Sequence, residues 1–256
     1  MNVRYRTWLC AAAFAIFCIV AASAQTVVPV NKEPSHHLAI SNEYVRVFKV
    51  EVAPKAETLY HQHDYDYVYV TIGDADLTNT RLNAAPATLK LKDGETRFAK
   101  APLIHKVRNN LDQPFRNVTI ELLKGTGNPI CGLANGEKTC GGGGGWGTGG
   151  GVEGGHSATV SGGGYETLLD SENLIVNTVS VDPGSTVPDT LIGEGPLLIV
   201  PISKARLKIM GNTEFGERDP GETIWVPGNS KRFIKNLSSK PIKFVMLEFK
   251  GIAVEQ

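Results

Sequence analysis

The stretch His61-Gln62-His63-Asp64-Tyr65-Asp66 runs into the strand-like segment 67–72, and Pro102-Leu103-Ile104-His105-Lys106-Val107-Arg108-Asn109 follows later in the chain. Residues two apart on a strand project to the same face, so His61 and His63 are expected to converge, and His105 from a neighbouring strand can complete the set. Neutral imidazoles are ligands for Fe, Mn, Ni, Zn or Cu. Three histidines leave open coordination positions, which is typical of a reactive site. A His-x-His pair alone would fit surface or core histidines equally well.

The rest of the chain favours an all-β fold. Short runs rich in Val, Ile, Tyr and Phe are separated by Pro, Gly, Asn and Asp, and no long stretch has helical apolar periodicity with caps. The clearest predicted strands are 44–52, 67–72, 115–123, 197–202 and 243–249. The pattern predicts a sandwich or barrel.

The two flanking segments are repeats of each other. Gly94-Glu95-Thr96 returns as Gly221-Glu222-Thr223, an offset of 127 residues. At the same offset His105 aligns with Arg232, Asn109 with Asn236 and Glu121 with Glu248, and upstream 50–54 aligns with 179–183 at an offset of 129. The chain is therefore predicted to be a duplicated β domain.

These residues resemble the two motifs of the cupin superfamily. The first motif is matched by Pro54, His61, His63 and Gly73, and the second by Gly94, Pro102, His105 and Asn109. The resemblance covers about residues 40–125 and, in a degenerate form, 166–250. It implies two jelly-roll β-barrels, a bicupin, with an N-terminal cupin domain at 25–125 and a C-terminal one at 166–256.

A fourth ligand is less clear, because the glutamate of the first cupin motif has no counterpart at the family spacing. Counting back from Gly73 reaches Asp66, which we take as the candidate, although Asp66 is equally suited to a turn. Tyr65 or Tyr67 could stand nearby as hydrogen-bonding or acid–base groups. His36 and His37 precede the first strand and are expected to be solvated.

The second copy is expected to keep the barrel without the metal. By the repeat offsets its ligand positions fall on Thr190, Ile192 and Arg232, and neither an isoleucine nor a cation can replace an imidazole. Arg232 could bind an anion or have a structural role.

Between the two copies lies a glycine-rich segment. Of the 28 glycines, 14 fall between Gly141 and Gly164. Such a segment buries little apolar surface, so residues 126–165 are predicted to be a linker or long surface loop. Cys131 and Cys140 are expected to form a local disulfide, with metal binding as the less favoured alternative.

The N-terminal residues have the pattern of a secretory signal peptide. Arg4 and Arg6 precede an apolar run that ends in Ala22-Ser23-Ala24. That run is about fifteen residues long, whereas a spanning helix needs about twenty. We therefore expect residues 1–24 to be removed and the protein to be secreted or periplasmic, without a stable membrane anchor.

The balanced charge and the family resemblance together narrow the possible functions. The chain of 256 residues has 26 basic and 26 acidic residues, which argues against nucleic acid as a partner. The resemblance implies a divalent metal and a small-molecule substrate, and hence a dioxygenase, isomerase or lyase, with an oxidoreductase of the dioxygenase type as one possibility. The alternative is a non-catalytic bicupin that binds a small ligand or partner. Both a monomer and a homodimer fit the sequence.

Overall fold

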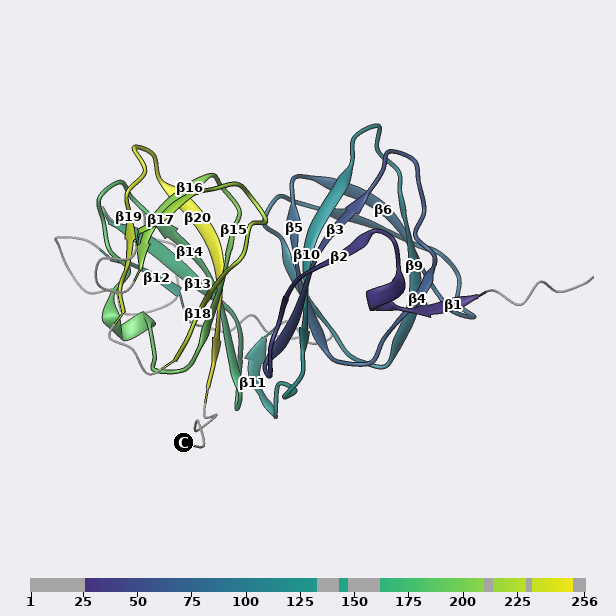
Figure 1. The fold of residues 1–256 in the computed structure, drawn as a ribbon, viewed down its shortest axis with the longest axis horizontal. Coiled ribbons are helices and arrows are strands. Elements are labelled where there is room, and N and C mark those ends of the chain that lie inside the picture. The colour runs from purple at the N-terminus through teal and green to yellow at the C-terminus, as the bar shows by residue number, and fades with distance from the viewer. Residues whose placement is uncertain (1–25, 133–142, 147–161, 210–213, 229–231, 251–256) are drawn as a thin grey trace, which may run out of the picture.

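The computed structural model describes residues 26–132, 143–146, 162–209, 214–228 and 232–250. Within these ranges the regular elements are β-strands and two short 3-10 turns, η1 (Val30–Lys32) and η2 (Asp189–Leu191). The strands form two barrels that lie side by side, one from each half of the chain (Figure 1). The predicted all-β, two-barrel architecture is confirmed.

The N-terminal barrel consists of two five-stranded sheets. One sheet has the order β1 (Val27–Pro29), β4 (Tyr60–His63), β9 (Leu103–Asn109), β6 (Ala75–Arg81) and β7 (Ala87–Leu91). The other has the order β2 (His36–Ser41), β3 (Val45–Val52), β10 (Phe115–Leu122), β5 (Tyr67–Ile72) and β8 (Thr96–Ala99). The predicted strands of this half agree with β3, β5 and β10 to within one residue.

The C-terminal barrel repeats this plan with fewer strands in its second sheet. Its large sheet has the order β11 (Pro129–Gly132), β13 (Gly163–Ser171), β14 (Leu174–Val181), β20 (Ile242–Phe249), β15 (Leu197–Pro201) and β18 (Ile224–Val226). Its small sheet has the order β17 (Glu214–Arg218), β16 (Ala205–Ile209) and β19 (Ile234–Asn236).

A buried asparagine marks the repeat in both barrels. The Nδ2 atom of Asn109 donates to the carbonyl oxygens of Val52, Ala53 and Gln113. Asn236 donates in the same way to the carbonyl oxygens at 181 and 240. Both asparagines are 0% exposed, so each satisfies backbone carbonyls that would otherwise be buried without a partner. The predicted duplication is therefore visible in matching hydrogen bonds.

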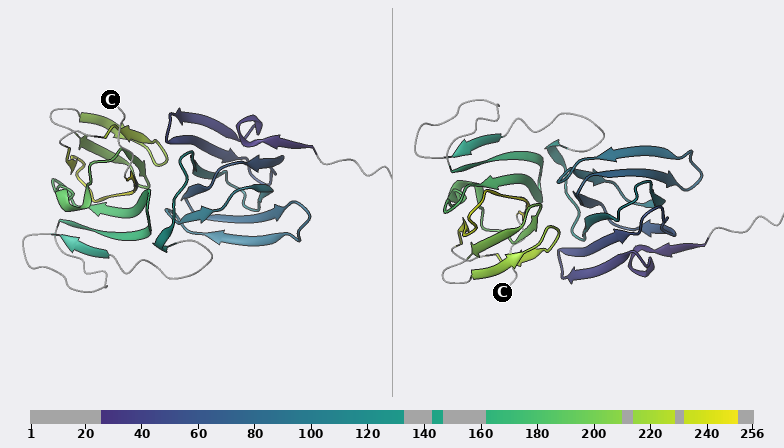
Figure 2. Two further views of the ribbon diagram at one scale, coloured as in Figure 1. Left: turned by 90° about the horizontal axis from the view of Figure 1, so that it is seen from below. Right: turned by 90° about the horizontal axis from the view of Figure 1, so that it is seen from above.

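The two barrels share one hydrophobic core. The outer face of the β2-β3-β10-β5-β8 sheet packs on the large sheet of the C-terminal barrel, and Figure 2 shows these sheets facing each other. Val70 and Val118 from the first barrel join Leu198, Val200 and Val245 from the second in this cluster. Since both faces of these sheets are buried, their strands contain near-continuous apolar runs.

Part of the predicted linker is ordered as strands. β11 pairs with β13, and so does β12 (Gly143–Trp146), while β13 itself begins at Gly163. The segment 126–165, predicted as a linker or long surface loop, therefore contains paired strands, because backbone hydrogen bonds at a sheet edge need no apolar side chains. Cys131 is disulfide-bonded. Cys140 lies outside the described residues, so its pairing with Cys131 stays a prediction.

The predicted signal peptide, residues 1–24, also lies outside the described residues. Among the residues that are described, no helix is long and apolar enough to cross a membrane.

Candidate metal centre

Two neighbouring strands of the N-terminal barrel bring the predicted histidines together. β4 pairs antiparallel with β9, and in this register His61 lies directly opposite His105. His61 and His63 alternate with the less buried Gln62, so both imidazoles point into the barrel and are 1% exposed. The ring centroids of His61 and His63 are 5.1 Å apart, and that of His105 is 4.6 Å from His61 and 5.4 Å from His63.

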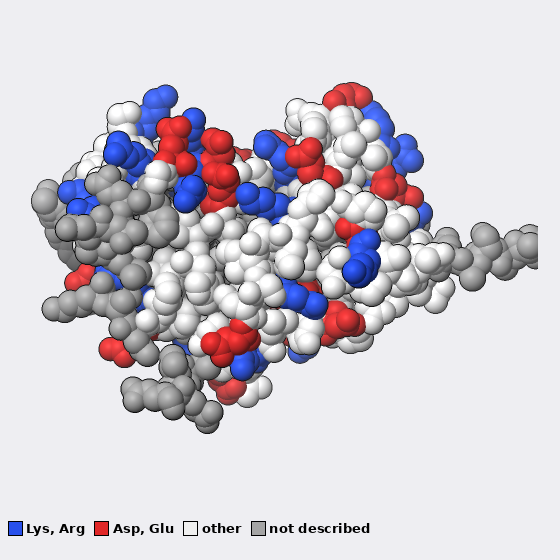
Figure 3. All heavy atoms as spheres, in the orientation of Figure 1, with Lys and Arg blue, Asp and Glu red and all other residues white. Residues whose placement is uncertain are grey.

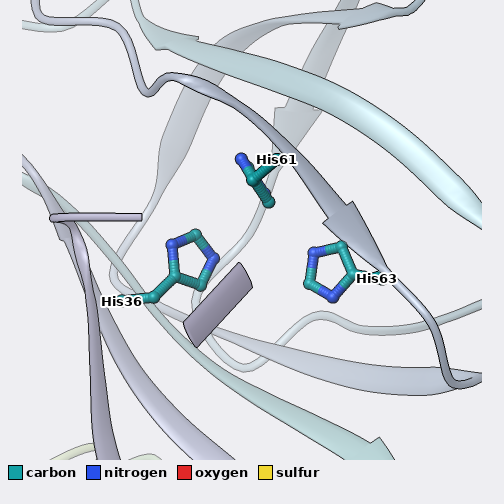
Figure 4. Close-up of side chains that lie close together, drawn as sticks. All are labelled: His36, His61 and His63. Carbon is teal, nitrogen blue, oxygen red and sulfur yellow. The ribbon is translucent and has the colours of Figure 1, made fainter. Parts of the chain in front are cut away.

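A fourth imidazole, His36, joins this group, although it was expected to be solvated. Its side chain is 5% exposed, and its ring centroid is 4.7 Å from that of His61 and 6.1 Å from that of His63. One nitrogen from each of His36, His61 and His63 lies within 4.8 Å of the other two, a group that does not include His105, and the three side chains point toward one another (Figure 4). His37, the next residue, is exposed as predicted.

Three of the four imidazoles are oriented by an acceptor at Nδ1. The Nδ1 atom of His61 lies 3.0 Å from the carbonyl oxygen of Leu59, and that of His105 lies 2.9 Å from Oδ1 of Asn79. The Nδ1 atom of His36 lies 2.7 Å from Oε2 of Glu33. A proton on each Nδ1 satisfies these acceptors and leaves Nε2 with a free lone pair. Metal-binding histidines are oriented by partners of this kind.

The Glu33 carboxylate also shapes the turn that carries His36. It accepts hydrogen bonds from the backbone nitrogens of Ser35 at 2.8 Å and Leu59 at 3.3 Å. Glu33 therefore ties η1 and the start of β2 to the segment before β4. This link across the two sheets is what places His36 beside His61.

A buried carboxylate, Glu121 of β10, lies beside the imidazole of His63. Its Oε1 atom lies 3.4 Å from Nδ1 of His63, and its Oε2 atom pairs with Nη2 of Arg46 at 2.7 Å. Glu121 is 0% exposed. Tyr67 stacks on the other side of the His63 ring at a centroid distance of 4.2 Å, and the two planes are 24° apart. The repeat singled out Glu121 by its match to Glu248, but no motif assigned it to the site.

The predicted fourth ligand, Asp66, has another partner. Its Oδ1 atom accepts a hydrogen bond of 2.8 Å from the backbone nitrogen of Ala101. Asp66 thus joins the turn after β4 to the loop before β9. The structure favours His36 over Asp66 as the fourth candidate ligand, because His36 lies in the imidazole group and the Asp66 carboxylate is engaged in the loop.

Burial keeps the imidazoles of His61, His63 and His105 neutral. Desolvation, followed by the charge of His36, lowers the pKa of His61 to about 3. Desolvation also lowers the pKa of His63, against the opposing effect of Glu121, and it lowers the pKa of His105 well below its ordinary value. At neutral pH these rings are acceptors of metal ions rather than cations.

The imidazoles line a cavity of about 220 Å³ inside the N-terminal barrel. Its wall is mainly aliphatic and aromatic and includes Leu77, Leu91, Val107 and Phe115. A concave, largely apolar site with a few convergent polar groups is suited to a small molecule.

The C-terminal barrel has no equivalent site among its described residues. Its interior is filled by apolar side chains, including Leu207, Phe244 and Met246, that are 0% exposed. Arg232, at the position of His105, donates to the carbonyl oxygens of Gly193, Gly195 and Pro227. Arg232 therefore has the structural role that was one of the two predicted.

The repeat register also shifts by one residue from the predicted one. Tyr67 pairs with Glu121 as Leu197 pairs with Glu248, which is an offset of 130 for the first strand of each pair. Counting back from this register places Leu191 and Gly193, rather than Thr190 and Ile192, at the positions of His61 and His63. Neither assignment supplies an imidazole.

Comparison with known proteins identifies the fold. No family model and no curated protein matches the chain. AerE from Microcystis aeruginosa is 12% identical over 86% of this chain and 99% of AerE, with a TM-score of 0.54. A tryptophan variant of Bacillus subtilis oxalate decarboxylase is 14% identical over 81% of this chain and 69% of that chain, with a TM-score of 0.50. A Bordetella pertussis cupin domain is 30% identical over 34% of this chain and 90% of that domain, with a TM-score of 0.33. The chain has the cupin fold, with two barrels as in AerE and oxalate decarboxylase, and its histidine cluster lies in the N-terminal barrel.

Proposed function

We propose that the N-terminal barrel binds a divalent transition metal and that the protein is a metal-dependent enzyme acting on a small organic molecule. The observation that carries this proposal is the convergence of buried imidazoles, three of which have their Nδ1 atoms already held by acceptors. His61, His63 and His105 would hold the ion, with His36 as the fourth ligand. A set of imidazoles suits Fe, Mn, Ni, Zn or Cu.

The buried polar atoms without a hydrogen-bond partner fit the binding of a cation. Nε2 of His105 and Nδ1 of His63 are buried without a hydrogen-bond partner among the described residues. Leaving such atoms unpaired costs about 1–3 kcal/mol each. A metal ion at the Nε2 atoms would satisfy His105 directly, and it would leave the Nδ1 proton of His63 free to face Glu121.

Several side chains of the cavity would position a bound molecule or the metal ligands. The bound ion would supply Lewis-acid or redox chemistry at its open positions. Apolar side chains make up much of the cavity wall, and Asn79 holds the ring of His105 in one orientation. Burial raises the pKa of Tyr67, so its hydroxyl keeps its proton and can donate a hydrogen bond to a bound molecule. The ion pair with Arg46 keeps the Glu121 carboxylate in place beside His63.

A second candidate function is a non-catalytic bicupin that binds a small ligand or partner. It is supported by the filled C-terminal barrel and by the missing glutamate of the first cupin motif. It predicts ligand-induced thermal stabilisation without turnover after reconstitution with any of the five metals.

Metal analysis of purified protein tests the metal proposal. The wild type is expected to hold about one ion per chain, and a His61→Ala, His105→Ala double variant to lose it. His37→Ala is the matched control, because His37 is exposed and adjacent to the cluster. Absence of metal from the wild type, or equal metal in the double variant, would refute the proposal. Turnover that is lost in His63→Ala would then decide for the enzyme over the non-catalytic alternative.

We also propose that the protein is exported and that its mature chain begins at Gln25. This rests on the signal-peptide pattern of residues 1–24. Intact-mass measurement of protein from the periplasm or medium is expected to show loss of these 24 residues, and a retained Met1 would contradict it.

A further inference from the structure

One arginine on β6 faces the candidate metal centre. On this strand Leu77, Asn79 and Arg81 alternate with outward residues, and all three line the cavity. Asn79 orients His105, and Arg81 lies directly opposite His105 in the β6–β9 register. Arg81, two residues after Asn79 on the same strand, therefore places a positive charge at the rim of the site.

The cavity wall is electrostatically one-sided. It contains Arg81 and Arg97 but no aspartate, glutamate or lysine. The guanidinium of Arg97 is already paired, because its Nη2 lies 2.7 Å from Oε1 of Glu95. The guanidinium of Arg81 has neither a hydrogen bond nor an ion pair with any residue that the structure describes, and only its backbone is bonded, for example to the nitrogen of Ala84. The positive charge available to a bound molecule is therefore that of Arg81.

The position of this charge is unfavourable for a metal site on its own. Burial and the neighbouring imidazoles are the main causes of the low pKa of His105, and the charge of Arg81 contributes in the same direction. Arg81 is an exposed residue at the rim of the cavity, and its guanidinium would repel a divalent ion held by the imidazoles, although water at the rim weakens this repulsion. An anion bound between the guanidinium and the metal ion would be attracted by both positive charges and would offset their repulsion.

We propose that the molecule bound in this cavity is a small organic acid and that Arg81 binds its carboxylate. Arginine matches a carboxylate with two parallel N–H donors, which gives both charge and orientation. The remainder of the acid would lie on the apolar wall formed by Leu77, Leu89, Phe98 and Val107. A cavity of about 220 Å³ limits it to a compact molecule. This inference rests on the proposed function, because it names the substrate class of the same site.

The test compares acids with their neutral amides. Pyruvate, succinate, benzoate and phenylacetate, each paired with its amide, are titrated into metal-loaded full-length protein by calorimetry. At least one acid is expected to bind at least tenfold more tightly than its amide. The same acid is expected to lose at least tenfold in affinity to Arg81→Gln, and Arg81→Lys, which keeps the charge without the two-pronged geometry, should lie between.

Arg108→Gln is the matched control, because Arg108 is an exposed residue on the opposite face of neighbouring β9. It should bind the acid as the wild type does. Equal affinity for acid and amide, or binding unaffected by Arg81→Gln, would overturn the inference. So would a panel in which no acid binds.

Metal content is measured on every variant before titration. If the protein holds no metal but an acid still binds in an Arg81-dependent way, the metal proposal fails and the inference about the substrate class stands. If the metal is present but replacing Arg81 does not change the binding of any acid, the metal proposal stands and the inference about the substrate class fails.

Discussion

At the scale of single residues, the sequence predicted the imidazoles that share a strand pattern and missed the one that does not. His61, His63 and His105 follow from two-residue alternation and a paired strand. His36 reaches the site through η1 and the carboxylate of Glu33, and these contacts depend on a turn that no motif specifies. Asp66 was chosen by counting, but its carboxylate is used by the backbone of Ala101.

Replacing Asn79 should weaken metal binding without removing a ligand. Asn79→Leu deletes the acceptor at Nδ1 of His105, so the ring loses its fixed tautomer and orientation. A loss of about 10- to 100-fold in metal affinity is expected. Competition with a chromogenic chelator measures it, and Thr80→Ala on the outward face of the same strand should leave the affinity unchanged. A wild-type affinity in Asn79→Leu would show that the hydrogen bond does not support the site.

Acid should destabilise the metal-free protein in a defined pH range. The pKa of His61 is about 3 in the folded protein, against an ordinary 6.5, so the unfolded chain binds more protons between these values. The free energy of unfolding should therefore fall as pH drops below 6.5, by at most about 1.4 kcal/mol per pH unit for each such histidine. His63 and His105 act in the same direction.

Urea denaturation of chelator-treated protein at pH 7.5 and 5.0 measures this loss. His61→Gln should show a smaller difference between the two pH values, because one of the neutral buried rings is gone. A free energy of unfolding that rises toward pH 5.0 would contradict the lowered pKa values of the buried histidines.

At the scale of elements, strands that are apolar on both faces were predictable and the edge strands were not. β5 and β15 are short Val- and Ile-rich runs whose turns are marked by Gly, Pro and Asp. β12 contains three glycines and a tryptophan, and it forms because β13 offers it a free edge. Such a strand depends on its partner rather than on its own side chains, so its sequence carries little signal.

The paired asparagines test whether the repeat holds each barrel together. Asn236→Ala removes an amide that donates to the carbonyl oxygens of Val181 and Lys240 and accepts from the nitrogen of Ser238. These groups would be left buried or poorly solvated, so a loss of about 2–4 kcal/mol in the free energy of unfolding is expected. Asn109→Ala should cost a similar amount. Denaturant titration measures both, and a change below 0.5 kcal/mol in either, about the size of an ordinary surface substitution, would contradict the shared role.

At the scale of the whole molecule, the two halves are joined by an apolar interface whose partners the sequence left open. Duplication predicted two barrels, but a monomer and a homodimer could both bury the same sheets. The structure pairs the barrels within one chain through a single core. Figure 3 shows basic and acidic side chains interspersed over both barrels on the face in view, without a field of one sign.

Two glycines of the repeat allow a matched test of this interface. Gly94 and Gly221 have φ values of +76° and +85°, so alanine at either position costs about 1–2 kcal/mol of backbone strain. A Cβ at Gly94 would lie 2.7 Å from the buried Ile202 of the other barrel, whereas at Gly221 the nearest atom, from Ile72, is 3.4 Å away. Gly94→Ala should therefore destabilise the protein more than Gly221→Ala, by about 1–3 kcal/mol. Equal thermal stabilities of the two variants would contradict the close packing of Gly94 against Ile202 of the other barrel.

The proposed binding of a metal by the imidazoles of the N-terminal barrel can be tested by anomalous diffraction. Crystals of the full-length protein, grown without added chelator, are measured above and below the absorption edge of the metal found by elemental analysis. One anomalous peak is expected within about 2.0–2.2 Å of the Nε2 atoms of His61, His63 and His105, with His36 as the fourth imidazole. A peak elsewhere in the molecule, or none in protein that carries stoichiometric metal, would contradict it.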